Sequence, residues 1–579
     1  MCGIVGYIGR RNAASVIVGG LKKLEYRGYD SFGVATTGSG VQVVKKKGRI
    51  SECGHLAENL TGNCGIGHTR WATHGVPDDI NAHPHTDCSG DFAIVHNGII
   101  ENYMDIRRSL ESEGHVFKSD TDSEVIAHLI EKFYEGDLLS AVFRLLPSLD
   151  GAYAFLAVAK DENRIVAARN SSPLVIGIGD DEYFASSDMT PVLEYTQKMI
   201  FPEDGDVMDI SAGGISVYSD KKPVVRPEEL VEWDIDSARK GGYDHFMLKE
   251  IFEQPSVFYE TFYSSLPCGE VEVLKNPSEI TVIACGTSYH AGMVFRYLME
   301  KCSSIPVRVD IASECRYFNP RQDSVVITVS QSGETADTIA ALKKAKAHGC
   351  RTIAITNVLG SSITRIADST FYTRAGPEIS VAATKSFIAQ VAIFMKIADL
   401  LCECGFEDEF SDIYQIIEDS LLTETDDAVS LCSNASNLFF VGRGLFYPVS
   451  LEGALKMKEI TYIHAEGYAA GELKHGPFSL LCENTPVVAL CTGDESRLLM
   501  LSNIKEIKAR GAPVIGIGSV GDQDLEELSD VYIPLPKSSE ISEVITSLVV
   551  LQLLAYRTAV KLGRDVDKPR NLAKSVTVI

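Results

Sequence analysis

The sequence predicts a layered α+β domain followed by two doubly wound α/β domains. Residues 2–220 alternate short apolar runs with Gly and Asp, and helical patterns separate these runs. That mixture is typical of a layered α+β domain. The rest of the chain contains an internal repeat of strand, polar loop and helix at an offset of about 160 residues. A repeat of this kind predicts two copies of one fold.

Three pairs of segments define the repeat. Each segment is an apolar, β-rich run that ends in a small or polar loop and precedes a helical pattern. This order is typical of parallel strands joined by crossover helices, so we expect two doubly wound domains related by duplication. The pairs are Ile280–Gly286 with Leu438–Gly444, Val325–Gly333 with Val487–Asp494, and Thr352–Asn357 with Val514–Ser519.

Composition divides the chain into five parts. A charged segment that carries Pro223 and Pro227 has no strong period, which predicts a linker. The stretch after Arg564 is polar and basic before its last residues become apolar, which predicts a tail. The expected parts are a first domain over 2–220, the linker over 221–240, α/β domains over 241–420 and 421–563, and the tail over 564–579.

The charge balance excludes some partners. The chain has 54 basic and 79 acidic side chains, for a net charge of −25. This disfavours nucleic acid, because phosphate backbones bind surfaces rich in Lys and Arg. It does not exclude a small anionic substrate, since backbone N–H groups at a helix start can hold a phosphate. The apolar stretch Val544–Tyr556 is shorter than the ~20 residues of a membrane span, so we expect a buried helix and no membrane partner.

Cysteine usage predicts a reducing compartment. The chain has 14 cysteines without any Cys-x-x-Cys pair, which favours reduced thiols in a cytoplasmic protein. Met1–Arg10 is too short and too Gly-rich for a signal peptide. No Cys or carboxylate completes a recognisable ligand set with four histidines of the first domain, so we expect no metal site in the chain. Those histidines are His68, His74, His83 and His85.

Cys2 is a candidate nucleophile. Removal of Met1 would leave Cys2 with a free α-amine of pKa ~7.7–8.0, which could accept the thiol proton. A Cys at position two is usually incidental, so this interpretation depends on four motifs that follow. They are Glu25–Ser31 (EYRGYDS), Gly67–Gly75 (GHTRWATHG), His96–Gly98 (HNG) and Ser119–Asp122 (SDTD).

Taken together, these motifs resemble the glutamine-hydrolysing domain of the N-terminal-nucleophile amidotransferases. The resemblance implies that Cys2 attacks glutamine, and that Asn97 and Gly98 form the oxyanion hole, a task that suits an amide and a backbone N–H. By itself, Asn97-Gly98 is also a typical turn dipeptide. Arg70 is implied to hold the substrate α-carboxylate, as a bidentate guanidinium can, and Asp122 the α-amine. The implied glutamine-binding residues are Arg27, Arg70, Trp71, His74 and Asp122.

Two hydroxyl-rich loops occupy predicted strand-to-helix turns, Cys285–Ser288 and Ser330–Thr335. Such loops can hold a phosphate with hydroxyls and free N–H groups; the alternative is simple helix N-capping. Together with Glu378–Lys385 they resemble the sugar isomerase domain, although Ala383 stands where that pattern has Ser. The implied sugar-phosphate residues are Cys285, Gly286, Thr287, Ser288, Ser330, Gln331, Ser332, Thr335 and Val381.

The second copy carries a different set of residues. Glu452, Lys456 and Glu459 follow at i, i+4 and i+7, so they share one helix face. The alternative is a solvated, salt-bridged face. His475 lies in Gly471–Pro477 (GELKHGP), and Lys574 lies in the tail motif NLAKSVTV. This set resembles the family of glutamine–fructose-6-phosphate aminotransferases.

That resemblance implies a glutamine-dependent conversion of fructose 6-phosphate to glucosamine 6-phosphate and glutamate, the first step of the hexosamine pathway. His475 is implied to open the sugar ring in a neighbouring subunit, Lys574 to form the Schiff base, and Glu459 to move the proton. Glu452 and Lys456 would position and tune Glu459. No cofactor is implied, because the ketose carbonyl itself is the electron sink. The implied partners are glutamine, fructose 6-phosphate and a second copy in a homodimer.

Two separate sites imply transfer of ammonia inside the protein, because ammonia released to neutral water is mostly protonated. The apolar residues Val576–Ile579 are candidates to shield this path, and Trp71 to gate it. The alternative functions are a glutamine amidotransferase with another phosphosugar acceptor and a non-catalytic phosphosugar sensor. A sensor would not need Cys2, Glu459 and Lys574 together.

Overall fold

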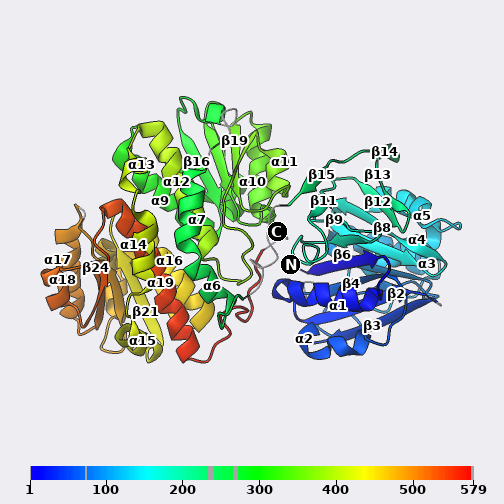
Figure 1. Cartoon of the computed structure of the whole chain (residues 1–579), viewed down its shortest axis with the longest axis horizontal. Helices are drawn as coiled ribbons and strands as arrows, with labels where there is room; N and C mark the ends of the chain where they lie inside the picture. The colour runs from blue at the N-terminus through cyan, green and yellow to red at the C-terminus, as the bar shows by residue number, and fades with distance from the viewer. Residues whose placement is uncertain are drawn as a thin grey trace. The chain divides into compact units, whose positions relative to one another are not determined.

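The chain forms two compact units (Figure 1). The computed structural model describes residues 2–38, 40–71, 75–231, 240–264, 266, 271–317, 319–493 and 495–575. One unit contains Met1–Ala238 with Ala573–Ile579, and the other contains Arg239–Leu572. The first unit therefore holds the N-terminal motifs, and the second holds the internal repeat. The domain limits expected within the second unit stay predictions.

Two antiparallel sheets form the first unit. The 8-stranded sheet has the order β15 (Glu228–Leu230), β11 (Lys198–Ile200), β9 (Val175–Ile178), β10 (Tyr183–Ser186), β1 (Gly3–Ile8), β4 (Cys64–Arg70), β2 (Ser31–Thr37) and β3 (Val41–Lys47). The 7-stranded sheet has the order β14 (Lys222–Val224), β13 (Gly214–Ser219), β12 (Val207–Ser211), β8 (Glu162–Asn170), β7 (Gly151–Ala159), β6 (Phe92–Ile100) and β5 (His85–Thr86).

Apolar side chains from both sheets form a shared core. Ile4 and Ile66 of the first sheet and Val95 and Leu156 of the second belong to one buried cluster. Helix α1 packs on β1 and β4, and helix α4 packs on β6, so each sheet has a helical cover. The predicted α-β-β-α layering is confirmed. The helices of this unit are α1 (Ala13–Leu24), α2 (Ile50–Cys53), α3 (Tyr103–Ser112), α4 (Glu124–Phe133) and α5 (Leu138–Leu145).

The second unit contains two parallel sheets with the same strand order. The first runs β17 (Val307–Ile311), β16 (Ile280–Ala284), β18 (Val325–Val329), β19 (Arg351–Thr356) and β20 (Ser369–Tyr372). The second runs β22 (His464–Ala469), β21 (Asn437–Gly442), β23 (Val487–Leu490), β24 (Val514–Ser519) and β25 (Val531–Leu535). The three predicted segment pairs fall on β16 and β21, β18 and β23, and β19 and β24. The predicted duplication of a doubly wound fold is therefore confirmed.

Helices join the two halves of this unit through one continuous core. Buried residues of both halves belong to a single cluster, and α9 of the first half packs against α16 of the second (Figure 1). The helices are α6 (Phe246–Phe252), α7 (Gln254–Tyr263), α9 (Gly286–Cys302), α10 (Ala336–Ala347), α11 (Ser362–Ile366), α12 (Lys385–Cys402), α13 (Phe406–Glu409), α14 (Ile413–Leu421), α15 (Asp426–Ser433), α16 (Phe446–Thr461), α17 (Arg497–Lys508), α18 (Gln523–Leu528) and α19 (Glu540–Lys561).

Helix α19 confirms the buried helix expected at Val544–Tyr556. Among the helices of the described residues, α19 alone is long and apolar enough to cross a membrane. However, 89% of its most apolar window is buried inside the protein. It packs against α14, α15 and α16. Its apolar character is therefore that of a core helix.

Candidate functional site

Cys2 lies directly before β1, where residues of two predicted motifs contact it. Its Sγ accepts a hydrogen bond from the Trp71 N–H at 3.1 Å and lies 3.5 Å from the Trp71 carbonyl oxygen. Asn97 Nδ2 donates to the Cys2 carbonyl oxygen at 2.9 Å. Burial raises the pKa of the Cys2 thiol, and the Trp71 N–H lowers it in part. The thiol therefore needs a base before it can act as a nucleophile.

A chain of neutral histidines fixes the orientation of Asn97. His68 Nε2 lies 3.0 Å from Asn97 Oδ1, and His68 Nδ1 lies 3.1 Å from His83 Nδ1. Burial lowers the pKa of His68 to about 3, so its ring is neutral near pH 7. A neutral ring that donates through Nε2 leaves the Asn97 NH₂ group to face Cys2. Sequence reasoning treated His68 and His83 only as metal candidates, although the place of His68 in the motif Gly67–Gly75 was a signal.

Asn97 and Gly98 do not form a turn. Both lie inside β6, where they pair with Ala154 and Tyr153 of β7, so the hairpin-turn alternative is wrong. Gly98 has φ 120°, and a Cβ there would come within 1.9 Å of the Ala152 carbonyl oxygen. Glycine is therefore required at this position of the strand, next to the Asn97 that contacts Cys2.

The charged residues expected at the glutamine site are buried. Arg70 ends β4 with 3% of its surface exposed, and its Nη2 donates to Gly75 O at 3.2 Å. Asp122 Oδ2 accepts the Ile100 N–H at 2.8 Å, two residues beyond Gly98 in β6. Arg27 pairs with Asp188 instead. His74, the remaining residue of this set, lies outside the described residues.

The hydroxyl-rich loops of the second unit lie at a topological switch point. Strand β16 has β17 on one side and β18 on the other, and the loops after β16 and β18 lead into α9 and α10. Ligands of doubly wound folds bind at the carboxyl ends of such strands. The structure thus brings Cys285–Ser288 and Ser330–Thr335 to the same end of adjacent strands.

The hydroxyls of the second loop converge on one another. Ser330 Oγ lies 2.9 Å from Thr335 Oγ1 and 3.5 Å from Ser332 Oγ. Thr335 occupies the N-cap position of α10, but its side chain makes no capping hydrogen bond. The N-capping alternative is therefore wrong for Thr335. Three hydroxyls beside the first turn of a helix match the donors that a phosphate requires.

Glu452, Lys456 and Glu459 form a charged row on α16. Lys456 Nζ lies 3.4 Å from a Glu452 oxygen and 2.5 Å from a Glu459 oxygen. Glu452 and Lys456 are each 1% exposed, so the alternative of a solvated face is wrong for them. Burial alone would lower the pKa of Lys456, but Glu459 and Glu452 raise it above its ordinary value. Lys456 is therefore held in its charged form.

The first turns of α9, which follow β16, touch this charged row. Thr287 Oγ1 donates to Glu452 at 3.0 Å and accepts from Lys456 Nζ at 3.2 Å. His290 Nδ1 lies 2.7 Å from the other Glu452 oxygen. Burial alone would raise the pKa of Glu452, but Lys456 and His290 lower it. His290 was missed by sequence reasoning, although its i+3 spacing from Thr287 places both on one helix face.

Three remaining residues lie apart from these contacts. The Val381 N–H donates to Asp567 O at 3.0 Å, so only its carbonyl could meet a substrate. His475 is exposed at the end of the short 3₁₀ helix Ala470–His475. Lys574 is half-buried and groups with the first unit.

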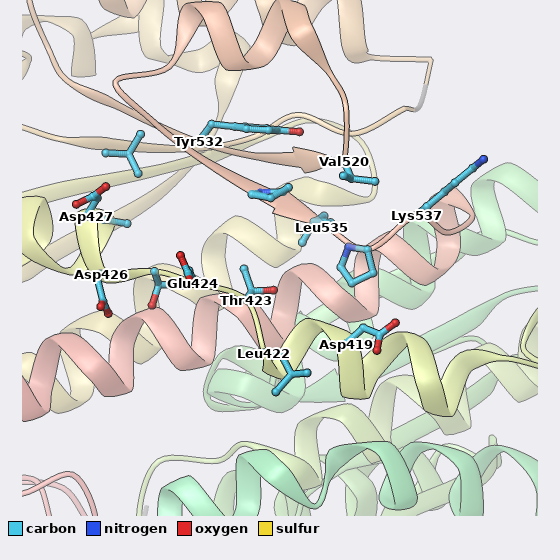
Figure 2. A pocket seen from close by; sticks show the side chains of 15 residues that line it. Asp419, Leu422, Thr423, Glu424, Asp426, Asp427, Val520, Tyr532, Leu535 and Lys537 are labelled. Carbon is cyan, nitrogen blue, oxygen red and sulfur yellow. The ribbon is translucent and has the colours of Figure 1, made fainter.

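The second unit also has a cavity of about 820 Å³ that contains none of the predicted substrate residues (Figure 2). It lies where the segment between α14 and α15 faces β25. Its lining includes Glu424, Asp426 and Asp427, with Lys537 as a basic member. A carboxylate-rich lining does not suit a phosphosugar.

Comparisons with known proteins cover the whole chain. The model of the SIS domain matches residues 273–398 and 431–562, and that of the glutamine amidotransferase domain matches residues 68–194. A glutamine–fructose-6-phosphate aminotransferase (isomerizing) from Clostridium acetobutylicum is 46% identical over 607 aligned residues, which cover 100% of both chains. Its namesake from Methanothermobacter thermautotrophicus is 47% identical over 595 residues, again with 100% of both covered.

A solved structure matches the second unit. The C-terminal domain of glucosamine-fructose-6-phosphate aminotransferase from Francisella tularensis is 38% identical, with a TM-score of 0.53. The match covers 57% of this chain and 100% of that one. The predicted combination of one glutaminase domain with a duplicated sugar isomerase domain is confirmed.

The neutral state of His68 makes a prediction about stability. Its pKa of about 3 lies below its usual 6.5, so between these values the unfolded chain binds a proton that the folded chain does not. As the pH is lowered through this window, the free energy of unfolding should therefore decrease, by up to about 1.4 kcal/mol per pH unit from this group. His68→Gln should reduce the slope.

Both tryptophans, Trp71 and Trp233, lie in Met1–Ala238, so thermal unfolding followed by tryptophan fluorescence reports on the first unit. Melting curves at about pH 7 and about pH 5 measure the slope. His348→Gln, an exposed position in the second unit, is the control. An unchanged slope in His68→Gln would contradict the burial argument.

Proposed function

We propose residue roles for this chain, which belongs to the family of glutamine–fructose-6-phosphate aminotransferases. The roles concern glutamine hydrolysis and the conversion of the sugar phosphate. The chain is a transferase that converts fructose 6-phosphate and glutamine to glucosamine 6-phosphate and glutamate. One observation supports our assignment above the others: a substrate loop of one sugar isomerase copy touches buried acid and base groups of the other. Thr287 in contact with Glu452 and Lys456 is what a site for proton transfer on a bound sugar needs.

Glutamine hydrolysis is assigned to the first unit. Cys2 attacks the side-chain carbonyl after Met1 is removed, and the exposed α-amine takes the thiol proton. Asn97 Nδ2 and the Gly98 N–H stabilise the oxyanion, a role that is supported because His68 already fixes the amide toward Cys2. Arg70 binds the α-carboxylate and Asp122 the α-amine. Arg27, bound to Asp188, acts by positioning.

Sugar binding is assigned to the switch point of the first sheet. The phosphate sits among Ser330, Ser332 and Thr335, with the first-turn N–H groups of α10 as further donors. The sugar then extends toward Thr287 and Ser288, and so toward α16. The main chains of Gln331, Cys285 and Gly286 shape these loops, and the Val381 carbonyl contributes from a third segment.

Proton transfer and imine formation are assigned to separate residues. Glu459 moves the proton between C1 and C2, and its ion pair with Lys456 holds its position. Lys456 itself is held charged between two carboxylates and is therefore a poor nucleophile. This supports Lys574 as the Schiff-base amine, an assignment that otherwise depends on the family resemblance. His475 opens the ring, and its exposed position fits a role in the site of a second subunit.

Two further proposals follow from the family. We infer a homodimer, because His475 would act across subunits. We also infer a cytoplasmic location, which fits the free thiols of the cysteines in the described part of the chain. Ammonia passes from Cys2 to the sugar within the protein; the residues Val576–Ile579 proposed to shield it lie outside the described residues.

The separation of the two chemistries makes the first of three predictions about activity. Cys2→Ala should abolish glucosamine 6-phosphate formation from glutamine but keep slow isomerisation of fructose 6-phosphate to glucose 6-phosphate. Glu459→Gln should stop both isomerisation and formation of glucosamine 6-phosphate, and it should keep glutamine hydrolysis. Glutamate, glucosamine 6-phosphate and glucose 6-phosphate are measured in the same reactions. Loss of isomerisation in a folded Cys2→Ala protein would contradict the assignment of glutamine hydrolysis and sugar isomerisation to separate sites.

The phosphate loop makes a second prediction. Thr335→Val removes one hydroxyl from a charged ligand, which costs about 1.5–3 kcal/mol, or about 10–150-fold in the KM for fructose 6-phosphate. Thr335→Ser keeps the hydroxyl and should stay near the parent protein. The KM for glutamine should not change in either variant. Equal KM values for fructose 6-phosphate in both variants would remove Thr335 from the phosphate site.

Trp71 makes a third prediction. Its main-chain N–H and carbonyl contact Cys2, while its ring packs on Tyr29 with centroids 5.5 Å apart. Trp71→Ala therefore keeps the contacts to Cys2 and removes only the proposed gate. Glutamate should form in excess over glucosamine 6-phosphate, and Trp71→Phe should keep more of the coupling. A one-to-one product ratio in Trp71→Ala would show that the ring is no gate.

A further inference from the structure

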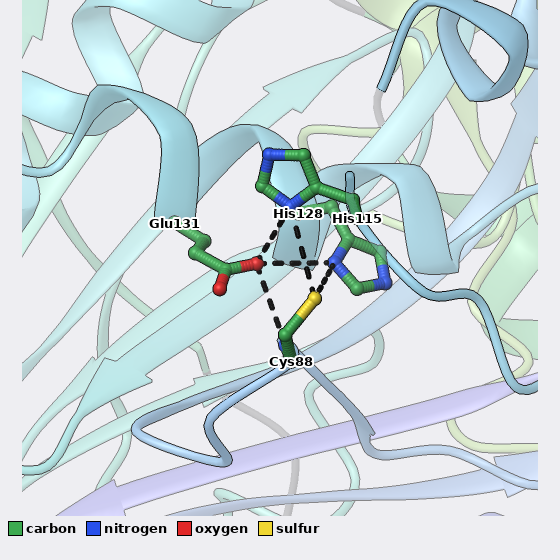
Figure 3. A group of neighbouring side chains, drawn as sticks. All are labelled: Cys88, His115, His128 and Glu131. Carbon is green, nitrogen blue, oxygen red and sulfur yellow. Dashed lines mark hydrogen bonds and ion pairs between the residues drawn. The ribbon is translucent and has the colours of Figure 1, made fainter. Parts of the chain in front are cut away.

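Four metal-ligating side chains converge in the first unit, apart from the glutamine site. Figure 3 shows Cys88, His115, His128 and Glu131 pointing toward one another. Cys88 lies in the turn between β5 and β6, His115 follows α3, and the other two lie on α4. One donor atom from each lies within 4.8 Å of all the others. Three segments distant in sequence therefore supply one cluster.

The distances are close to those of a tetrahedral metal shell. Bond lengths near 2.0–2.3 Å to zinc place tetrahedral ligand atoms about 3.3–3.7 Å apart. Cys88 Sγ lies 3.6 Å from His128 Nδ1 and 3.8 Å from His115 Nδ1. The Glu131 oxygen lies 2.8 Å from His115 Nδ1 and 3.2 Å from His128 Nδ1. Of these four distances, the two to the carboxylate are shorter than the shell requires, and the half-buried Glu131 side chain can retreat by a few tenths of an ångström.

The surroundings of the cluster resemble those of a metal centre. His128 is fully buried, and its second nitrogen, Nε2, lies 3.5 Å from Glu124 Oε1. Nε2 makes no hydrogen bond at this distance, so Glu124 contributes a nearby negative charge behind the ring. The Val116 N–H donates to Cys88 Sγ at 3.4 Å, so a backbone donor already faces the sulfur. A solvated ion pair would need neither the cysteine nor the second carboxylate.

We propose that Cys88, His115, His128 and Glu131 form a structural Zn²⁺ site. A thiolate, two imidazoles and a carboxylate are ligands that zinc accepts, and the thiolate argues against magnesium or calcium. Four protein ligands complete the tetrahedral shell and leave no position for a reacting water, so the role is structural. This proposal departs from the expectation of no metal in the chain, for which only His68, His74, His83 and His85 were weighed. The His-x-x-Glu spacing on α4 was the available signal, but its other two ligands are distant in sequence.

The site has a consequence that rests on the proposed function. Glu124, behind His128, accepts the backbone N–H groups of Lys118 and Ser119 at 2.8 Å and 2.7 Å. These residues lead into the loop that carries Asp122, the proposed ligand of the glutamine α-amine. Zinc would hold α4 and this loop in register with β6. Its removal should therefore raise the KM for glutamine several-fold and leave the KM for fructose 6-phosphate unchanged.

Metal binding is tested on the full-length chain without reference to activity. The protein is stripped with a chelator and titrated with Co²⁺, whose spectrum reports a thiolate ligand and tetrahedral geometry. We expect about one Co²⁺ per chain with a thiolate charge-transfer band, displaced by Zn²⁺. The titration uses a Cys2→Ala background, because an N-terminal cysteine offers its own thiol and amine. Absence of the band would overturn the proposal.

Matched variants locate the site. Cys88→Ser should remove the thiolate band, and His115→Ala should weaken Co²⁺ binding at least tenfold. Cys482→Ser, at another exposed cysteine, should change neither. A band that persists in Cys88→Ser would overturn the assignment. Both Cys88 and His115 lie at or near the surface, so these variants should fold.

The link to glutamine is measured separately, with Cys2 intact. Chelation should raise the KM for glutamine in the parent protein and have no effect in Cys88→Ser, whose KM is already raised. Stoichiometric metal with an unchanged KM would overturn the link to Asp122 alone. Because the metal titration needs no turnover, failure of the proposed glutaminase roles would leave the binding result unchanged.

Discussion

The buried charge row on α16 is the constraint on which the second unit depends. Taking Glu452 and Lys456 out of water costs several kcal/mol per ion unless each finds a partner. The partners come from both sides: Glu459 on the same helix, and Thr287 and His290 on α9 of the other half. The two copies therefore have to pack with α9 against α16 for these charges to be satisfied. The same packing brings a substrate loop to acid and base groups.

Duplication explains how one fold supplies both parts of this site. Both copies keep the same order of five parallel strands, because the apolar strands and their crossover helices are what the fold requires. The loops after the strands are free to differ. The first copy keeps three converging hydroxyls after β18, whereas Cys491–Gly493 follow the matching strand β23. The second copy instead carries the charged residues on α16, so binding and acid–base chemistry are divided between the copies.

The first unit solves a different problem, the orientation of an amide. Either end of the Asn97 side chain could face Cys2, and only one end can donate a hydrogen bond to a developing oxyanion. Burial keeps His68 neutral, and its Nε2–H donates a hydrogen bond to the Asn97 side-chain oxygen. The neutral ring thus orients the amide without bringing a charge of its own into a buried site, where an unpaired charge is costly.

The sequence by itself determined the strands, the repeat and the residue types of both sites, because periodicity and motif spacing are local properties of the chain. It left open whether Asn97-Gly98 is a turn, whether Thr335 caps its helix, and whether the α16 row is solvated. Tertiary structure decided each of these, since the answer depends on contacts that motif spacing does not show: β7 beside Gly98, the Ser330 hydroxyl folded back on Thr335, and α9 beside Glu452. The contact between Cys88 and His128 likewise depends on tertiary structure, because the two residues are 40 positions apart in the sequence. A side chain's chemistry follows from its burial and partners, and only the folded chain supplies those.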